Sequence, residues 1–116
     1  MRERDFQAAV VELARLAGWR CYHTFDSRRS EPGFPDLCLV RGGQIVFAEL
    51  KTAHGRLSAA QREWLAALGA CPGVDAVLWR PEDWDEIEGV LIGGRAGGWW
   101  AAELVPSVRE RVSKRG

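Results

Sequence analysis

The sequence has no excess of charge of either sign. Among its 116 residues, 16 Lys and Arg are balanced by 16 Asp and Glu, so the formal net charge at pH 7 is zero. Proteins that coat nucleic acid without selectivity are strongly basic, and this balance argues against that class. It still allows an enzyme that gathers positive charge around one site.

The sequence is also poor in cysteine. Cys21, Cys38 and Cys71 are odd in number, scattered along the chain and without a Cys-x-x-Cys pair. A disulfide framework or a zinc site would need paired, closely spaced residues. We therefore expect reduced, mostly buried thiols in a cytoplasmic protein, with a phage or a bacterium as compatible settings.

Long apolar runs are missing as well, and so are repeats. No run approaches the roughly 20 residues that a membrane-spanning helix needs, and no signal-peptide pattern is visible. The length predicts one domain. Residues 90–116 contain two Gly-Gly pairs, Trp99-Trp100 and a basic end. We leave open whether they form an edge hairpin, a dimer contact or a floppy terminus.

Two strand-like runs, residues 36–40 and 44–51, flank Gly42-Gly43. Gly-Gly between such runs predicts a tight β-hairpin. A two-residue loop pairs Arg41 with Gln44 and puts Asp36 directly opposite Glu49. A four-residue loop gives the same register, whereas a three-residue loop does not.

Opposed residues of a hairpin share a face, with Cβ atoms about 5 Å apart. Asp36 and Glu49 would therefore repel each other unless a cation lay between them. Mg²⁺ takes oxygen ligands, often one or two carboxylates with water and substrate phosphate. Lys51, two residues beyond Glu49, points to the same face, and the Leu50 carbonyl is a candidate further ligand. The pattern predicts a metal site for phosphodiester cleavage, with Lys51 beside the attacking water.

The remaining elements follow from periodicity and turn residues. We expect helices over residues 2–17, 58–68 and 82–88, and further strands over 19–24 and 75–80. The order α-β-β-β-α-β-α predicts an α/β fold with a small mixed sheet flanked by helices. The run Ile45 to Ala48 fits a central strand buried on both sides.

Three segments together resemble a stand-alone VRR-NUC domain of the PD-(D/E)xK nuclease superfamily. They are Gly33-Phe34-Pro35-Asp36, Glu49-Leu50-Lys51 and residues 55–61, which end in Leu-Ser-x-x-Gln. The resemblance extends over about residues 2–88. It implies a restriction-endonuclease-like core, with a nuclease domain over residues 1–89. It also implies DNA hydrolysis that depends on Mg²⁺ or Mn²⁺.

The resemblance further implies a carboxylate from the first helix, for which Glu3 and Glu12 compete. Glu3 precedes Phe6 by three residues and continues the apolar stripe, whereas Glu12 lies about 120° away and should face solvent. We favour Glu3 as a metal ligand, although an acid at a helix start is also favoured by the helix dipole. Gln7, one turn on, is a candidate DNA contact.

Gln61 has two predicted roles. Ser58-x-x-Gln61 is a capping box, and in the resemblance the same glutamine belongs to the active site. The two roles are compatible. Basic residues around the expected site form a candidate DNA-binding surface with Gln7. These are Arg28, Arg29, His54, Arg56 and Arg62.

We therefore predict a metal-dependent, structure-specific endonuclease that cuts branched DNA. A homodimer with two sites suits the symmetric cuts of a four-way (Holliday) junction, and flap or fork cutting is the nearest alternative. A non-catalytic DNA-binding module on the same fold is the second hypothesis. A metal-dependent nucleotide hydrolase is the third, and it lacks a Gly-rich phosphate loop. We expect no membrane partner and no nucleotide cofactor.

Overall fold

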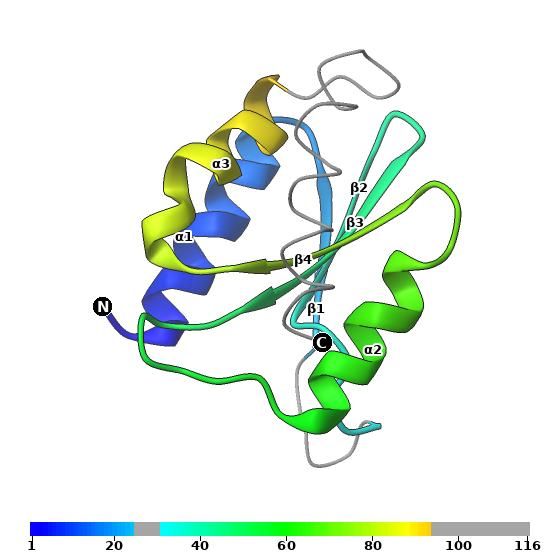
Figure 1. The fold of residues 1–116 in the computed structure, drawn as a ribbon. Helices are drawn as coiled ribbons and strands as arrows, with labels where there is room; N and C mark the ends of the chain where they lie inside the picture. Colours follow the sequence, from blue (N-terminus) through cyan, green and yellow to red (C-terminus); the bar gives the residue numbers. More distant parts are fainter. Residues whose placement is uncertain (25–30, 94–116) are drawn as a thin grey trace.

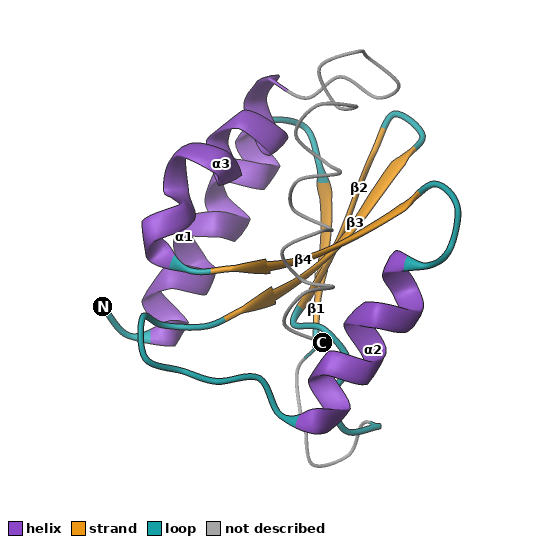
Figure 2. Cartoon of the chain, viewed as in Figure 1, coloured by secondary structure: helices purple, strands orange, loops and turns teal. Residues whose placement is uncertain are grey.

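The computed structural model describes residues 1–24 and 31–93, and its elements follow the predicted order (Figures 1 and 2). The helices are α1 (Glu3–Leu16), α2 (Ala59–Gly69) and α3 (Trp84–Glu88), and the strands are β1 (Arg20–His23), β2 (Leu37–Arg41), β3 (Gln44–Leu50) and β4 (Val74–Trp79). A 3-10 turn, Pro81–Asp83, precedes α3, and a π-helical turn, Gly89–Gly93, follows it. The predicted order α-β-β-β-α-β-α is confirmed.

The sheet has the strand order β1-β2-β3-β4. The pairings of β1 with β2 and of β2 with β3 are antiparallel, whereas β3 and β4 are parallel. A parallel pair needs a crossover connection, and α2 provides it between β3 and β4. The sheet is therefore mixed, as predicted, and β3 lies inside it.

The β2–β3 hairpin has the two-residue loop that Gly42-Gly43 predicts. Both glycines have positive φ, 54° and 83°, which is the backbone conformation of the hairpin turns that favour glycine. Arg41 pairs with Gln44, and Leu37 pairs with Ala48. Extending this register by one residue puts Asp36 opposite Glu49, as the sequence predicts.

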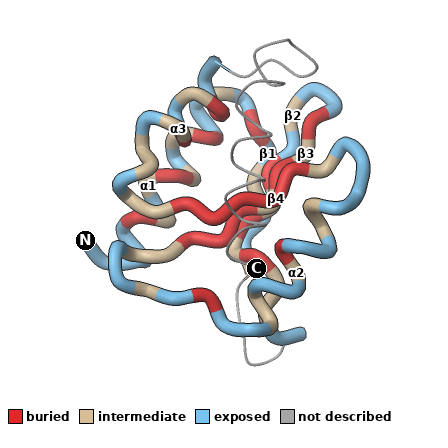
Figure 3. Tube along the Cα trace, in the orientation of Figure 1, coloured by how far each residue is buried: buried red, intermediate tan, exposed pale blue. Residues whose placement is uncertain are grey.

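Helices cover both faces of the sheet (Figure 2). On one face, α1 and the segment around α3 pack on the larger core. Its buried residues include Phe6, Val10 and Ala14 of α1 and Val46, Ala48 and Leu50 of β3. On the other face, Leu65 of α2 packs on Ala76 and Leu78 of β4. Figure 3 shows the buried strands between the exposed outer sides of the helices.

The fold continues past residue 89, because Val90 and Leu91 are buried in the larger core. Residues 94–116 lie outside the described residues, so the extent of the C-terminal extension stays a prediction. The expected burial of the thiols is wrong for Cys71, which is exposed in the turn after α2, while Cys21 and Cys38 are half-buried. Within residues 1–24 and 31–93, no helix is long and apolar enough to cross a membrane.

Candidate active site

The hairpin brings two carboxylates together on the α2 side of the sheet. Glu49 is only 2% exposed although it is charged in its ordinary state. Asp36 stands just before β2, where its Oδ2 accepts a hydrogen bond of 2.8 Å from the Leu50 N–H. That bond fixes the Asp36 carboxylate beside the end of β3. The predicted pair is therefore built by the strand register and one backbone hydrogen bond.

The surroundings of this pair disfavour the ionised form of both carboxyl groups. Burial and, to a smaller extent, the Asp36 charge raise the pKa of Glu49 to about 8, although the Lys51 ammonium opposes both effects. Burial also raises the pKa of Asp36, while the Leu50 N–H bond lowers it. A buried and a half-buried carboxylate side by side resist being ionised together unless a positive charge joins them. The site therefore favours a bound cation.

Two further side chains contact Glu49 through the same oxygen. Gln61 Nε2 donates to Glu49 Oε2 over 2.9 Å, and Lys51 Nζ lies 3.8 Å from that atom. Gln61 also completes the predicted capping box. Its Oε1 accepts the Ser58 backbone N–H at 2.8 Å, and the backbone N–H of Gln61 donates to Ser58 Oγ. One amide side chain thus joins the start of α2 to the buried carboxylate.

The second oxygen of Glu49 shows that the site fits a divalent cation. Glu49 Oε1 is buried and has no hydrogen-bond partner within the described part of the chain. An unpartnered buried carboxylate oxygen is costly, and a metal ion would satisfy it. Mg²⁺ commonly takes one or two carboxylates and keeps several waters. Asp36 and Glu49 match that donor set, and residues 1–24 and 31–93 contain no group of three or more His, Cys, Asp or Glu side chains arranged for a metal.

The carboxylate predicted from the first helix is exposed, and it belongs to no cluster of three or more metal-binding side chains within residues 1–24 and 31–93. Glu3 is the first residue of α1, and its side chain is exposed. Gln7 is half-buried one turn on, and Glu12 is exposed as expected. Glu3 therefore stays a predicted ligand. The Leu50 carbonyl stays one as well, and the structure adds that the N–H of Leu50 already holds Asp36.

The predicted basic surface is placed in part. His54, Arg56 and Arg62 are exposed, whereas Arg28 and Arg29 lie outside the described residues. Arg56 and Arg62 line one hollow of about 370 Å³ together with Leu57, Leu78 and Arg80. Sequence reasoning missed Arg80, because its place depends on how β4 pairs with β3.

The loop before Asp36 is fixed by close packing on α2. Gly33 has a φ of +91°, and a Cβ there would lie 2.5 Å from the Ala60 carbonyl carbon, so the position requires glycine. Phe34 packs edge-on against Trp64, with ring centroids 5.0 Å apart, and against Phe47 at 5.7 Å. These contacts explain why Gly-Phe precedes Pro-Asp.

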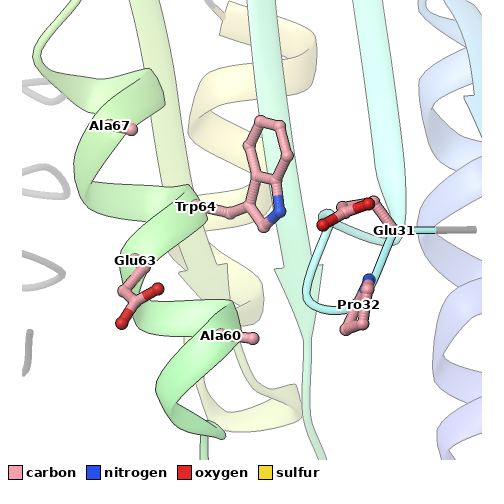
Figure 4. A pocket seen from close by; sticks show the side chains of 6 residues that line it. All are labelled: Glu31, Pro32, Ala60, Glu63, Trp64 and Ala67. Atoms are coloured by element: carbon pink, nitrogen blue, oxygen red, sulfur yellow. The ribbon is translucent and has the colours of Figure 1, made fainter.

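A second hollow, of about 390 Å³, lies between this loop and α2 (Figure 4). Across it the Trp64 indole faces Glu31 and Pro32. Its lining residues are Glu31, Pro32, Ala60, Glu63, Trp64 and Ala67. Two acids and an apolar wall make this hollow unsuited to phosphate.

A model of the VRR-NUC domain family matches residues 3–81, which is well over half of the chain. The chain therefore belongs to the VRR-NUC domain family, within the PD-(D/E)xK nucleases, as its motifs predict. Among solved structures it is similar to Hjc, a Holliday junction resolvase from the archaeal hyperthermophile Archaeoglobus fulgidus. The identity is 26% over 67% of each chain, with a TM-score of 0.48. A search of curated proteins found no match.

Proposed function

We propose that this nuclease-family protein is a Mg²⁺- or Mn²⁺-dependent endonuclease that hydrolyses phosphodiester bonds in branched DNA. The observation that carries the proposal is the pairing of half-buried Asp36 with buried Glu49, with one unpartnered Glu49 oxygen in the described part of the chain and with Lys51 beside it. Membership of the VRR-NUC family supports nuclease chemistry at this site. An intact set of Asp, Glu and Lys disfavours a non-catalytic DNA-binding module.

Each residue of the site has a distinct role in this proposal. Asp36 and Glu49 hold the metal ion, with Glu3 and the Leu50 carbonyl as additional ligands. A divalent ion held there would supply a Lewis acid and a nucleophilic water near neutral pH. The Lys51 ammonium orients the attacking water and offsets charge that builds on the phosphate. The Gln61 amide holds the Glu49 carboxylate in place through its 2.9 Å hydrogen bond.

The preferred substrate is a four-way junction, cut by a homodimer. A two-fold dimer would carry two sites for symmetric cuts. Flap or fork cutting by single sites is the alternative. DNA contacts are assigned to the predicted surface. It consists of Gln7, Arg28, Arg29, His54, Arg56 and Arg62.

Cleavage of labelled four-way junction, flap, fork, single-stranded and linear duplex DNA tests the proposal, with Mg²⁺, Mn²⁺ or EDTA and with Lys51→Ala as the matched variant. We expect metal-dependent cutting that Lys51→Ala abolishes while its thermal unfolding stays close to that of the parent. Paired cuts on the junction, together with a dimer in sedimentation experiments, would support the resolvase assignment. Tight binding without cutting on every substrate would instead identify a binding module.

A further inference from the structure

Three arginines surround one hollow beside the candidate active site. Arg56, Arg62 and Arg80 line it, and Leu57 and Leu78 supply apolar wall. Among the described residues its lining contains no acidic residue, although the chain as a whole has equal numbers of acidic and basic residues. Guanidinium groups gathered in this way repel one another unless an anion lies between them.

The hydrogen bonds of Arg80 leave the phosphate-binding edge of its side chain available. Its Nη1 donates to the Thr52 carbonyl at 2.6 Å and to the Gly55 carbonyl at 2.7 Å. A guanidinium has five N–H groups, of which Nη1 carries two, so the three on Nε and Nη2 have no acceptor among residues 1–24 and 31–93. The Asp83 Oδ2 accepts the backbone N–H of Arg80 at 2.8 Å. The two carbonyls therefore fix the fork of Arg80 without occupying all of it.

The hollow lies next to the carboxylate pair. Leu78 of β4 is paired with Glu49 of β3, so both side chains project from the same face of the sheet. Neighbouring strands are about 4.8 Å apart. Arg62 directly follows Gln61, the residue that bonds to Glu49. Along one DNA strand the repeat is about 3.4 Å of helix axis per nucleotide. The hollow is thus within one or two nucleotides of any phosphate held at Glu49.

We propose that Arg56, Arg62 and Arg80 form a pocket for a single backbone phosphate of DNA, one or two nucleotides from the bond that is cut. The proposal rests on the proposed nuclease function for the identity of its ligand. Arginine suits this task because its planar fork binds phosphate oxygens in pairs. The pocket would set the register of the strand across the metal site. Arg80 would be the pre-oriented member, and Arg56 and Arg62 would close on the phosphate from the exposed side.

The salt dependence of DNA binding tests the pocket without any cleavage. Binding of labelled junction and flap DNA is measured in EDTA over a series of salt concentrations, for the parent, Arg56→Gln, Arg62→Gln and the double variant. Arg15→Gln is the matched control, because Arg15 is an exposed residue in the last turn of α1, across the sheet. Each neutralised phosphate contributes about 0.9 to the slope of log K against log salt.

One shared phosphate makes a specific prediction. The double variant keeps Arg80 and should lose at most about 0.9 from the slope, whereas two independent phosphate contacts would lose about twice that amount. Affinity should fall at least about ten-fold in the double variant, as expected for lost charge-assisted hydrogen bonds. A loss equal to two independent contacts, or a double variant that behaves like Arg15→Gln, would overturn the proposal.

A second measurement places the phosphate. Single methylphosphonates, which remove one backbone charge, are introduced at each position around the cut site. At one position the neutral linkage should weaken the parent but not the double variant. If every position weakens both proteins equally, the pocket does not hold a particular phosphate. Absence of cleavage by the parent would remove the nuclease proposal, while the salt series would still decide whether the pocket binds phosphate.

Discussion

The two faces of β3 differ in what they contribute to the molecule. Val46, Ala48 and Leu50 point to the α1 side and are at most 1% exposed in an apolar core. On the α2 side lies Glu49, equally inaccessible but carrying a carboxyl group. Lys51 follows just beyond the end of the strand. Because side chains alternate along a strand, one segment serves two purposes: one face stabilises the fold and the other carries the candidate active site.

The α2-side face of β3, which carries Glu49, is stabilised less well than the apolar face. Glu49 Oε1 has no partner in the described part of the chain, and burial works against its ionised form. Such a group lowers stability in the absence of a ligand, which is a common property of functional sites. Substitutions on the two faces should therefore have opposite effects. On the face that carries Glu49 they should lower activity but keep stability. On the apolar face they should lower stability but keep activity.

The largest effect is expected from Glu49→Gln. The amide keeps the shape of the side chain but removes the charge that the metal ion needs, so cleavage should fall by about 10³-fold or more. Stability in EDTA at pH 8 should stay the same or rise, because the buried charge is gone. Steady-state cleavage and thermal unfolding check the two halves. A variant that loses both activity and fold would break the comparison between the faces.

The next effect belongs to the apolar face. Leu39→Ala removes a fully buried side chain of β2 that pairs with Val46, and the free energy of unfolding should fall by about 2–5 kcal/mol. Denaturant unfolding measures the loss. Cleavage per folded molecule, at a temperature where the variant is folded, should stay within a few-fold of the parent. A ten-fold fall under those conditions would mean that the core also controls the chemistry.

The pH dependence of stability sharpens the contrast further. The pKa of Glu49 in the folded protein is about 8, well above that of an exposed glutamate. The folded state therefore binds more protons than the unfolded state between about pH 4.5 and pH 8. Stability is highest below this window and falls through it as pH rises. The raised pKa of Asp36 acts in the same direction.

Melting temperatures in EDTA from pH 5 to pH 9 should show this fall. Mg²⁺ should reduce it, because a cation favours the ionised carboxylates that bind it. Glu49→Gln should flatten the profile in EDTA and remove the effect of Mg²⁺. A profile of the parent that is already flat would mean that the carboxylate pair carries no such strain.

The sequence predicted the strand register and therefore the carboxylate pair, because both follow from local rules. The two-residue loop at Gly42-Gly43 and alternation along the strands are enough to put Asp36 opposite Glu49. The burial of Glu49 was harder to predict from the sequence, since it depends on how α2 and β4 are placed around it. The exposure of Cys71 was missed because it follows from where α2 ends.

Arg80 shows what local rules cannot give. The position of Arg80 near the candidate site depends on the parallel pairing of β3 with β4, which places Leu78 beside Glu49. It also depends on the carbonyls of Thr52 and Gly55, more than twenty residues earlier in the chain. Neither spacing nor composition signals these long-range contacts. Whether Glu3 can reach the carboxylate pair is equally hard to predict, because it depends on the position of α1 against the sheet.

The smallest expected effect separates the two roles of Gln61. Ser58→Ala removes the side-chain cap of α2, which should cost about 1 kcal/mol of stability, but it leaves the Gln61 bond to Glu49. Gln61→Ala should cost a similar amount and also release Glu49 Oε2, so cleavage should fall about ten-fold. Unfolding and cleavage assays on both variants make the comparison. Cleavage should stay within about two-fold of the parent for Ser58→Ala. If both variants lose activity equally, Gln61 acts only through the helix cap, and its hydrogen bond to Glu49 does not contribute to cleavage.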